Sequence, residues 1–330
     1  MDNLFTTRTL TTAINKMGKA GRRMFQRHFA GKLRYSVDSQ LQFDIVTGNQ
    51  GILKNITVHE PAPIGKKTGR ATVTLEAPRI AEKRIIHVAE INKLRAYGAM
   101  GAETMKQRIA REQFDLRIEF DRTIEYWASQ AIRGKILDAD LSTVLVDYGL
   151  PSTHLITLTG TDKFTDAASK IIKTLRAWKQ LIEDDSMAEI SGFQCWCGSK
   201  VMDALLDNTK ILELMKYTVG AQIARSARIA ELAEIKFDEY MGSFIHTDGS
   251  RKRFLAENEL ILIGEGPDVF DCPYTAQLIE NLFQVGQAPP LFYSKSWKEE
   301  DPEGRWIYGE SRPLPILKRP ECVIVATPVD

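Results

Sequence analysis

The fold is decided by one uninterrupted stretch, AETMKQRIAREQFDLRIEFDRTIEYWASQAIR (residues 102–133). Apolar residues recur in it at spacings of three, four and seven, which places them on one face of an α-helix. They are Met105, Ile109, Leu116, Phe120, Ile124, Trp127 and Ala131. Neither Pro nor Gly interrupts the stretch, and Gly134 ends it. At about 1.5 Å per residue the predicted helix is about 50 Å long, more than a small domain needs.

Oppositely charged residues lie four positions apart on the other side of this predicted helix. The pairs are Arg108/Glu112, Arg111/Asp115 and Arg117/Asp121. Side chains at this spacing are neighbours on a helix, and opposite charges there stabilise it. The pattern predicts that all three pairs lie on the solvent face, opposite the apolar stripe.

The region before the helix alternates with the period of a β-strand. Apolar residues alternate over 41–45 and again over 71–75, with a further run over 52–58. A loop tip between them, residues 61–70, holds two prolines, two glycines and two adjacent lysines. A hairpin with so little apolar surface is marginal alone, and we expect it to pack on a partner.

The region after the helix mixes helix and strand. Residues 135–148 predict a strand or hairpin, and 165–183 a second amphipathic helix capped by Asp162 or Thr165. Residues 201–206 and 211–215 predict short helices, and 260–264 a buried strand. The apolar tail over 314–317 and 322–326 predicts a strand pair or one broken strand.

The composition of the 330 residues is that of a globular protein. Hydrophobic residues make up 43% and charged residues 26%, which excludes a disordered chain, a fibre and a disulfide scaffold. The apolar runs are too short to cross a bilayer, and no secretory leader is predicted. Four cysteines suit a reducing compartment.

The net charge of +1 hides an asymmetry. Residues 1–45 carry eight basic and three acidic side chains, a net charge of +5, which leaves −4 for the remainder. This basic segment predicts an arm that lies on something else. Its cations could neutralise DNA phosphates, contact protein, or mark a transit leader. The acidic remainder of the same chain is one available partner.

No enzyme motif is present. Cys195-Trp196-Cys197 lacks the usual redox or zinc spacing, so both cysteines are expected in the core; a metal site would need His154, His246 or Cys272. Gly264-Glu265-Gly266-Pro267 is expected to form a turn rather than a phosphate loop. The sequence therefore predicts no catalytic residues, no cofactor and no bound metal.

Four later segments carry a resemblance to a known family. They are Gly134–Asp140 (GKILDAD), Cys197–Leu205 (CGSKVMDAL), Phe237–Gly242 (FDEYMG), and Gly309–Pro315 (GESRPLP) with Arg319–Glu321 (RPE). In this order they resemble the lambda-type major capsid protein E family of tailed phages, which has the Hong Kong 97-type fold. The sequence departs from the family at Leu141, Met241 and Arg312, where Gly, Arg and Asn are usual.

The resemblance implies an α+β fold with named parts. Residues 1–45 would be the N-terminal arm and 46–82 the extended E-loop hairpin. Residues 83–187 would be a peripheral domain with its spine helix at 102–134, and 188–312 an axial domain. Residues 313–330 would be a C-terminal strand returning to the peripheral domain.

The resemblance also implies contacts between subunits. The E-loop tip would reach a neighbour through Pro61, Pro63, Gly65, Lys66, Lys67, Gly69 and Arg70. The arm would contact neighbours through Lys16, Lys19, Arg22, Arg23 and Arg27. Some proteins of this fold crosslink through an E-loop lysine and an asparagine, but lambda-type relatives generally do not.

The resemblance implies a major capsid protein and not an enzyme. Hexamers and pentamers would form an icosahedral head around double-stranded DNA, assembled in the host bacterial cytoplasm with a separate scaffolding protein, a portal and, in some heads, a decoration protein. No membrane partner is expected. Three alternatives remain open: a nucleic-acid-binding protein using the basic arm, a minor virion structural protein, and an enzyme centred on Cys195 and Cys197.

Overall fold

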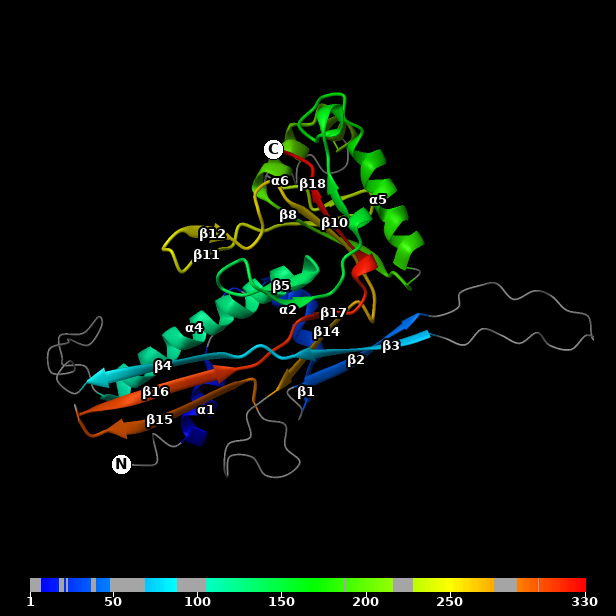
Figure 1. The fold of residues 1–330 in the computed structure, drawn as a ribbon. Coiled ribbons are helices and arrows are strands. Elements are labelled where there is room, and N and C mark those ends of the chain that lie inside the picture. Colours follow the sequence, from blue (N-terminus) through cyan, green and yellow to red (C-terminus); the bar gives the residue numbers. More distant parts are fainter. Residues whose placement is uncertain are drawn as a thin grey trace, which may run out of the picture.

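A computed structural model describes residues 7–17, 21, 23–36, 40–47, 69–87, 105–186, 188–215, 228–275, 290–301 and 303–330. Helices and strands are mixed, as the predicted α+β class requires. A lower body surrounds the long helix α4 (Met105–Ile132), and an upper body surrounds a six-stranded sheet (Figure 1). Among the described residues, none of the helices has both the length and the apolar character needed to cross a bilayer.

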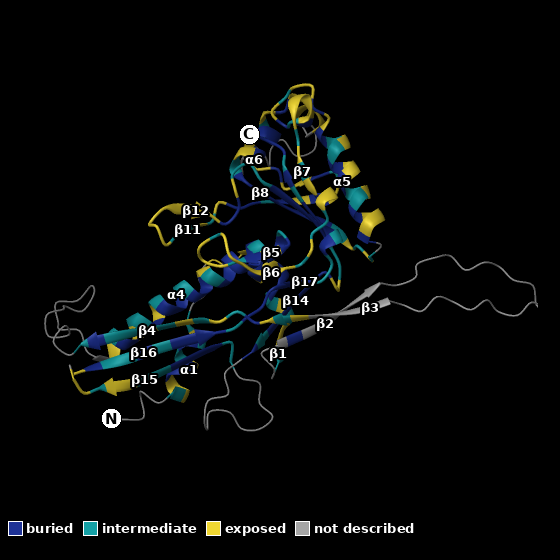
Figure 2. Ribbon diagram, viewed as in Figure 1, coloured by how far each residue is buried: buried dark blue, intermediate teal, exposed yellow. Residues whose placement is uncertain are grey.

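Helix α4 is the predicted long helix, and its apolar stripe is buried where the structure describes it (Figure 2). It packs on a three-stranded sheet in the order β15 (Phe292–Glu299), β16 (Gly304–Ser311) and β4 (Ile80–His87). A Cβ on Gly309 would lie 2.8 Å from the Phe120 ring, so the close approach of β16 to the helix needs this glycine. Gly134, at φ +87°, ends the helix in the left-handed region that glycine adopts easily.

The six-stranded sheet separates two hydrophobic cores. Its order is β7 (Leu155–Thr157), β18 (Val323–Thr327), β13 (Leu260–Glu265), β8 (Gly192–Cys197), β10 (Ile235–Glu239) and β9 (Glu231–Leu232). Successive residues of a strand point to opposite faces. Cys195 and Leu262 therefore face a core shared with α5 (Ile171–Ser186), α6 (Ser199–Asp207) and α7 (Thr209–Met215), whereas Trp196 and Ile261 face the core of α4.

Smaller elements complete the described chain. They are α1 (Thr7–Lys16), α2 (Arg23–His28), a sheet of β1 (Leu33–Ser36), β14 (Phe270–Thr275) and β17 (Ile316–Leu317), and hairpins of β5 (Lys135–Leu137) with β6 (Val144–Asp147) and β11 (Ser243–Ile245) with β12 (Arg251–Arg253). Short 3₁₀ turns lie at Ala30–Lys32, Ser152–His154, Gly160–Asp162 and Pro320–Cys322.

The predicted hairpin before α4 is present where the structure describes it. Strands β2 (Gln40–Thr47) and β3 (Gly69–Glu76) pair with each other and reach away from both bodies (Figure 1). The register sets Leu41 opposite Leu75 and Phe43 opposite Val73, which confirms the alternation that predicted both strands. The apolar run expected as a strand over 52–58 lies outside the described residues.

The second helix begins later than predicted. Helix α5 starts at Ile171, not at Thr165, and Asp162 belongs to a 3₁₀ turn rather than to a cap. The Asp166 carboxylate accepts the Ala168 N–H at 2.7 Å, and Ser169 N–H bonds back to the Asp166 carbonyl. These local bonds compete with helical ones, which is why the pattern overestimated the helix.

The strand pairing joins segments that lie far apart in the chain. Strand β18 pairs with β13 and β7, so the C-terminal strand lies in the six-stranded sheet. Helix α5 also packs in the upper core, whereas β15 and β16 lie on α4. The apolar tail is one broken run, because β17 and β18 join different sheets. Pairing partners far apart in the chain decide this grouping.

Candidate functional site: docking of the N-terminal arm

The N-terminal arm lies in the core of its own chain. Helix α1 packs on β15, and α2 packs on α4. Leu10 and Ile14 of α1 are buried, as are Met24 and Phe25 of α2 and Phe29 just beyond it. Burial of such side chains contributes about 1.5–3 kcal/mol each. The described arm is therefore an integral part of the fold.

A stripe of polar side chains on α4 faces the arm. Gln113, Arg117, Asp121, Glu125 and Ser129 recur at every fourth residue, and each is 3% exposed or less. The prediction that the Arg117/Asp121 pair lies on the solvent face is therefore wrong. The pair faces the arm instead, because a helix surrounded by chain on several sides has little solvent face here. The spacing of four beside the apolar stripe is the signal that could have revealed it.

The first half of this polar stripe holds α1. The Arg117 guanidinium donates to the Ile14 carbonyl at 3.0 Å and to the Asp121 carboxylate at 3.1 Å. It also lies over the Phe292 ring, with 3.6 Å from its carbon to the ring centroid. Gln113 donates to the Ser294 hydroxyl at 3.0 Å, beside the carbonyl of Leu10. Helix α1 is thus tied to α4 and to β15 together.

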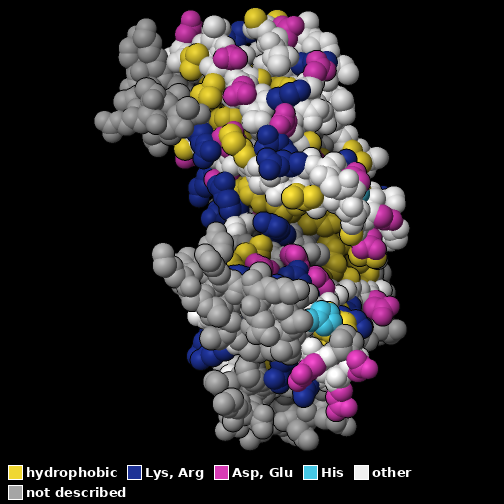
Figure 3. Space-filling model, turned by 90° about the vertical axis from the view of Figure 1, so that its left-hand side faces the viewer, with side chains coloured by type: hydrophobic (Ala, Val, Ile, Leu, Met, Phe, Trp, Pro, Cys, Tyr) yellow, Lys and Arg dark blue, Asp and Glu magenta, His cyan; other side chains and the backbone are white. Residues whose placement is uncertain are grey.

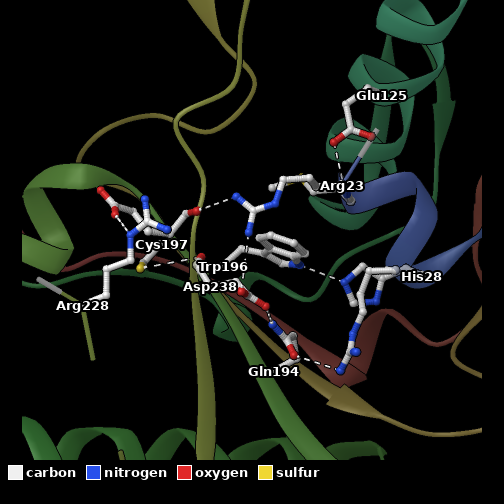
Figure 4. Close-up of polar contacts among 11 residues, drawn as sticks. Arg23, His28, Glu125, Gln194, Trp196, Cys197, Arg228 and Asp238 are labelled. Atoms are coloured by element: carbon white, nitrogen blue, oxygen red, sulfur yellow. Dashed lines mark hydrogen bonds and ion pairs between the residues drawn. The ribbon is translucent and has the colours of Figure 1, made fainter. Parts of the chain in front are cut away.

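Glu125 holds the start of α2 (Figure 4). Its two carboxylate oxygens accept the backbone N–H groups of Met24 at 2.9 Å and Phe25 at 3.0 Å. The Tyr240 hydroxyl donates to the same carboxylate at 2.7 Å. Burial, together with the charge of Glu125, raises the pKa of Tyr240, so its hydroxyl stays a donor. A buried carboxylate is tolerated here because three donors satisfy it.

Arg23 joins the arm to the upper sheet. Its guanidinium carbon lies 5.8 Å from the ring centroids of both Trp196 and Tyr240, within cation–π range. It donates to the Glu239 carbonyl at 3.1 Å and lies 3.6 Å from the Asp238 carboxylate. This side chain therefore makes its contacts within its own chain.

Two further arginines of the arm have partners in the same chain. Arg27 donates to Gln194 at 3.2 Å and to Glu265 at 3.0 Å. Arg34 donates to both oxygens of Asp271, at 2.7 Å for the shortest bond. Half-exposed ion pairs of this kind contribute little to stability. They do, however, pair cations of the arm, which has a net charge of +5, with carboxylates of the remainder, which has a net charge of −4.

His28 is buried between the arm and the upper sheet. The Trp196 indole N–H donates to its Nε2 at 2.8 Å, which requires an unprotonated nitrogen there. Burial first, and then the charges of Arg27 and Lys32, lower the pKa of His28 to about 3. The ring is therefore neutral in the folded protein.

This depressed pKa predicts a pH dependence of folding. In the unfolded chain His28 has its ordinary pKa of 6.5, so between pH 6.5 and 3 the unfolded state binds more protons. The contribution of neutral His28 to the free energy of unfolding is complete above pH 6.5. It is lost as the pH falls, by up to about 1.4 kcal/mol per pH unit. For His28→Gln, the free energy of unfolding should fall less steeply as the pH is lowered from 7 to 4. Urea unfolding at several pH values measures this slope. Equal slopes would contradict this role.

The structure brings together only some of the predicted site residues. Lys16 is exposed at the end of α1, and Arg23 and Arg27 make the contacts above. Gly69 and Arg70 open β3, opposite Thr47 and Val46. Lys19, Arg22, Pro61, Pro63, Gly65, Lys66 and Lys67 lie outside the described residues. Glu125, Arg117 and Trp196 were not predicted.

Cys195 and Cys197 lie in the buried strand β8, as expected for core cysteines. Burial raises the pKa of Cys195 well above its usual value and that of Cys197 to about 12. Both side chains are therefore buried, protonated thiols in this structure. Within the part of the chain that the structure describes, no three His, Cys, Asp or Glu side chains form a metal-binding group.

Solved structures of similar fold include phage capsid proteins. The putative capsid protein of a prophage of E. coli CFT073 has a TM-score of 0.62 at 15% identity, with 98% of each chain covered. The mature capsid of bacteriophage PhiM1 gives 0.56 at 11% identity, covering 94% of this chain and 87% of that chain. The capsid of Ralstonia phage GP4 gives 0.57 at 10% identity, covering 94% and 92%. No curated protein matches significantly.

The family assignment comes from the sequence itself. The profile of phage major capsid protein E matches residues 6–327, nearly the whole chain. This match agrees with the resemblance that the four motif segments indicated, and the capsid neighbours show the expected Hong Kong 97-type fold. Proteins of this family and fold are structural proteins of the virion shell. The chain belongs to the phage major capsid protein E family and is a capsid shell subunit.

Proposed function

We propose that this subunit forms hexamers and pentamers that close an icosahedral head around double-stranded DNA. One observation supports it most: β2 and β3 pair only with each other and reach away from the rest of the chain (Figure 1). Their register sets Leu41 opposite Leu75. A two-stranded ribbon is marginal alone, so packing on a neighbouring subunit would explain it.

The named parts keep their roles in this proposal. The hairpin serves as the E-loop, α4 as the spine of a peripheral domain, and the upper sheet as the axial domain. Lys16, Lys19 and Arg22 stay proposed contacts with neighbours, with the E-loop tip residues over 61–70. Arg23 and Arg27 also stay proposed contacts with neighbours, besides the bonds that they make to the Glu239 carbonyl and to Glu265 of their own subunit.

Assembly would occur in the host bacterial cytoplasm with a separate scaffolding protein and a portal, with a decoration protein in some heads. We propose no catalytic role and no cofactor. Direct DNA binding by the arm is less well supported, because Arg23, Arg27 and Arg34 already contact carboxylates of the chain. A minor virion protein would differ by its low abundance in particles.

Shortening the hairpin tests this function. We expect replacement of residues 48–68 by Asn-Gly, the preferred two-residue hairpin turn, to preserve the β2–β3 pairing. The variant should fold, with thermal unfolding within about 3 °C of wild type, because the described hairpin adds little to either core. Negative-stain microscopy should show shells for the wild type and few or none for the variant. Normal shells from the variant would contradict the E-loop assignment.

A further inference from the structure

The β11–β12 hairpin contacts α4 through Phe244, whose ring centroid lies 5.3 Å from that of Tyr126, and both of its strands are otherwise exposed. Its two strands pair only with each other, and a hollow of about 390 Å³ lies between it and α4. Ile245 is 70% exposed at the end of β11, and Met241 just before it is 50% exposed. Figure 2 shows the hairpin as one of the most exposed parts of the upper body. Its own subunit therefore does not cover it.

The hairpin carries cations without partners. All three residues of β12 are exposed. Arg253 pairs with Glu257 at 2.7 Å, but Arg251 and Lys252 have no acidic partner among the described residues. Lys and Arg side chains gather at mid-height on the face seen in Figure 3, beside exposed apolar side chains. Met and Arg are enriched at protein contact surfaces, and Met241 and Arg251 are both exposed at this hairpin.

The C-terminal end of α5 is acidic, in contrast to the basic β12. Glu183, Asp184 and Asp185 stand in its last turn, which holds no basic residue. The C-terminus of a helix carries partial negative charge, so each carboxylate there is unfavourable by about 0.3–1 kcal/mol. Asp185 contacts His154 at 2.9 Å. Glu183 and Asp184 are exposed and have no basic partner in the described chain. The isolated subunit gains nothing from these two charges.

The two surfaces lie on opposite sides of the upper body at about the same level (Figure 1). We propose that the β11–β12 hairpin of one subunit docks on the C-terminal end of α5 in a second copy. Such a contact joins two different surfaces of the same chain, and it closes into a ring when the rotation between copies allows. The inference rests on the proposed hexamers and pentamers and names one contact within them.

The chemistry favours a second copy over another partner. Arg251 and Lys252 would face Glu183 and Asp184, and the cations would also meet the negative end of the helix. Complementary charges of this kind steer association and fix its register, and like charges facing each other oppose it strongly. Each ring repeats the contact in every subunit, so a small change per contact has a large effect on assembly.

Charge reversal tests the contact. Arg251→Glu/Lys252→Glu and, separately, Glu183→Lys/Asp184→Lys should each lower the yield of rings and shells at least about tenfold. The combined variant restores opposite charges and should recover to within about threefold of wild type. Yield is measured by sedimentation and negative-stain microscopy. Glu183→Lys/Asp184→Lys suits the helix end, so its assembly defect is not caused by unfolding.

A matched control changes the net charge equally elsewhere. Lys106 and Lys236 are exposed and have no acidic partner among the described residues, and Lys106→Glu/Lys236→Glu should assemble as wild type. The proposed contact would be overturned if the hairpin variant or the helix variant alone assembled normally. It would also be overturned if the combined variant did not recover. If the wild type itself forms no rings, the proposed function fails as well. If the wild type and the reversed variants all form rings, only this inference fails.

Discussion

Arg117→Ala is expected to lower the free energy of unfolding by about 3–5 kcal/mol. The substitution leaves Asp121, which is fully buried, without its 3.1 Å guanidinium partner. It also removes the donor to the Ile14 carbonyl and the contact with the Phe292 ring. The loss of the guanidinium beside a buried carboxylate and the release of α1 act in the same direction. Urea unfolding followed by circular dichroism measures the loss.

The same helix offers a matched control. Arg108 pairs with Glu112 at 2.8 Å with the same spacing of four, but both side chains are partly exposed. Arg108→Ala should therefore cost less than about 1 kcal/mol. The double variant Arg117→Met/Asp121→Leu removes both charges and should recover most of the loss. A double variant as unstable as Arg117→Ala would show that the loss of the guanidinium partner of Asp121 is not the cause.

Glu125→Ala is expected to lower the free energy of unfolding by about 3 kcal/mol or more. It removes the acceptor of three groups at once: the N–H groups of Met24 and Phe25 and the Tyr240 hydroxyl. Each buried donor left without an acceptor costs about 1–3 kcal/mol. Because α2 starts at these N–H groups, hydrogen exchange in α2 should also become faster.

Glu119 is the control on the same helix. Its carboxylate contacts Arg84 at 2.5 Å, yet its side chain is 45% exposed. Glu119→Ala should cost less than about 1 kcal/mol and leave exchange in α2 unchanged, since water replaces the lost partner. If both glutamate variants lost the same stability, the docking role of Glu125 would be wrong.

The spacing of apolar residues along the chain predicted the long helix and the hairpin, because each depends on residues that are close in the sequence. The stripe from Ile109 to Ala131 identified α4, because 3.6-residue periodicity follows from helix geometry alone. The alternation of Leu41 and Phe43 against Val73 and Leu75 identified the hairpin in the same way. Four short segments, weak one by one, identified the family through their order. Turn residues such as Asp166 were misjudged, since their side chains compete with helical hydrogen bonds.

The place of a charged side chain in the fold determines whether it is buried and which partner it contacts. Arg108/Glu112 and Arg117/Asp121 have the same spacing in the sequence, yet only the second pair is buried. The polar spacing around residue 117 can indicate a buried stripe, but it does not identify α1, about a hundred residues earlier, as the segment that covers it. The cations of the arm likewise found their partners in Asp238, Glu265 and Asp271, far along the chain.

Periodicity, composition and motif order are enough to establish the family, the long helix and the basic arm set against an acidic remainder. All three depend on residues that are near each other in the chain. The folded structure was needed to show that the basic arm is held by its own subunit, and which of two ion pairs with the same spacing is buried. Those outcomes depend on contacts between distant segments, where burial makes an unpaired charge or donor costly and so determines how the arm is held.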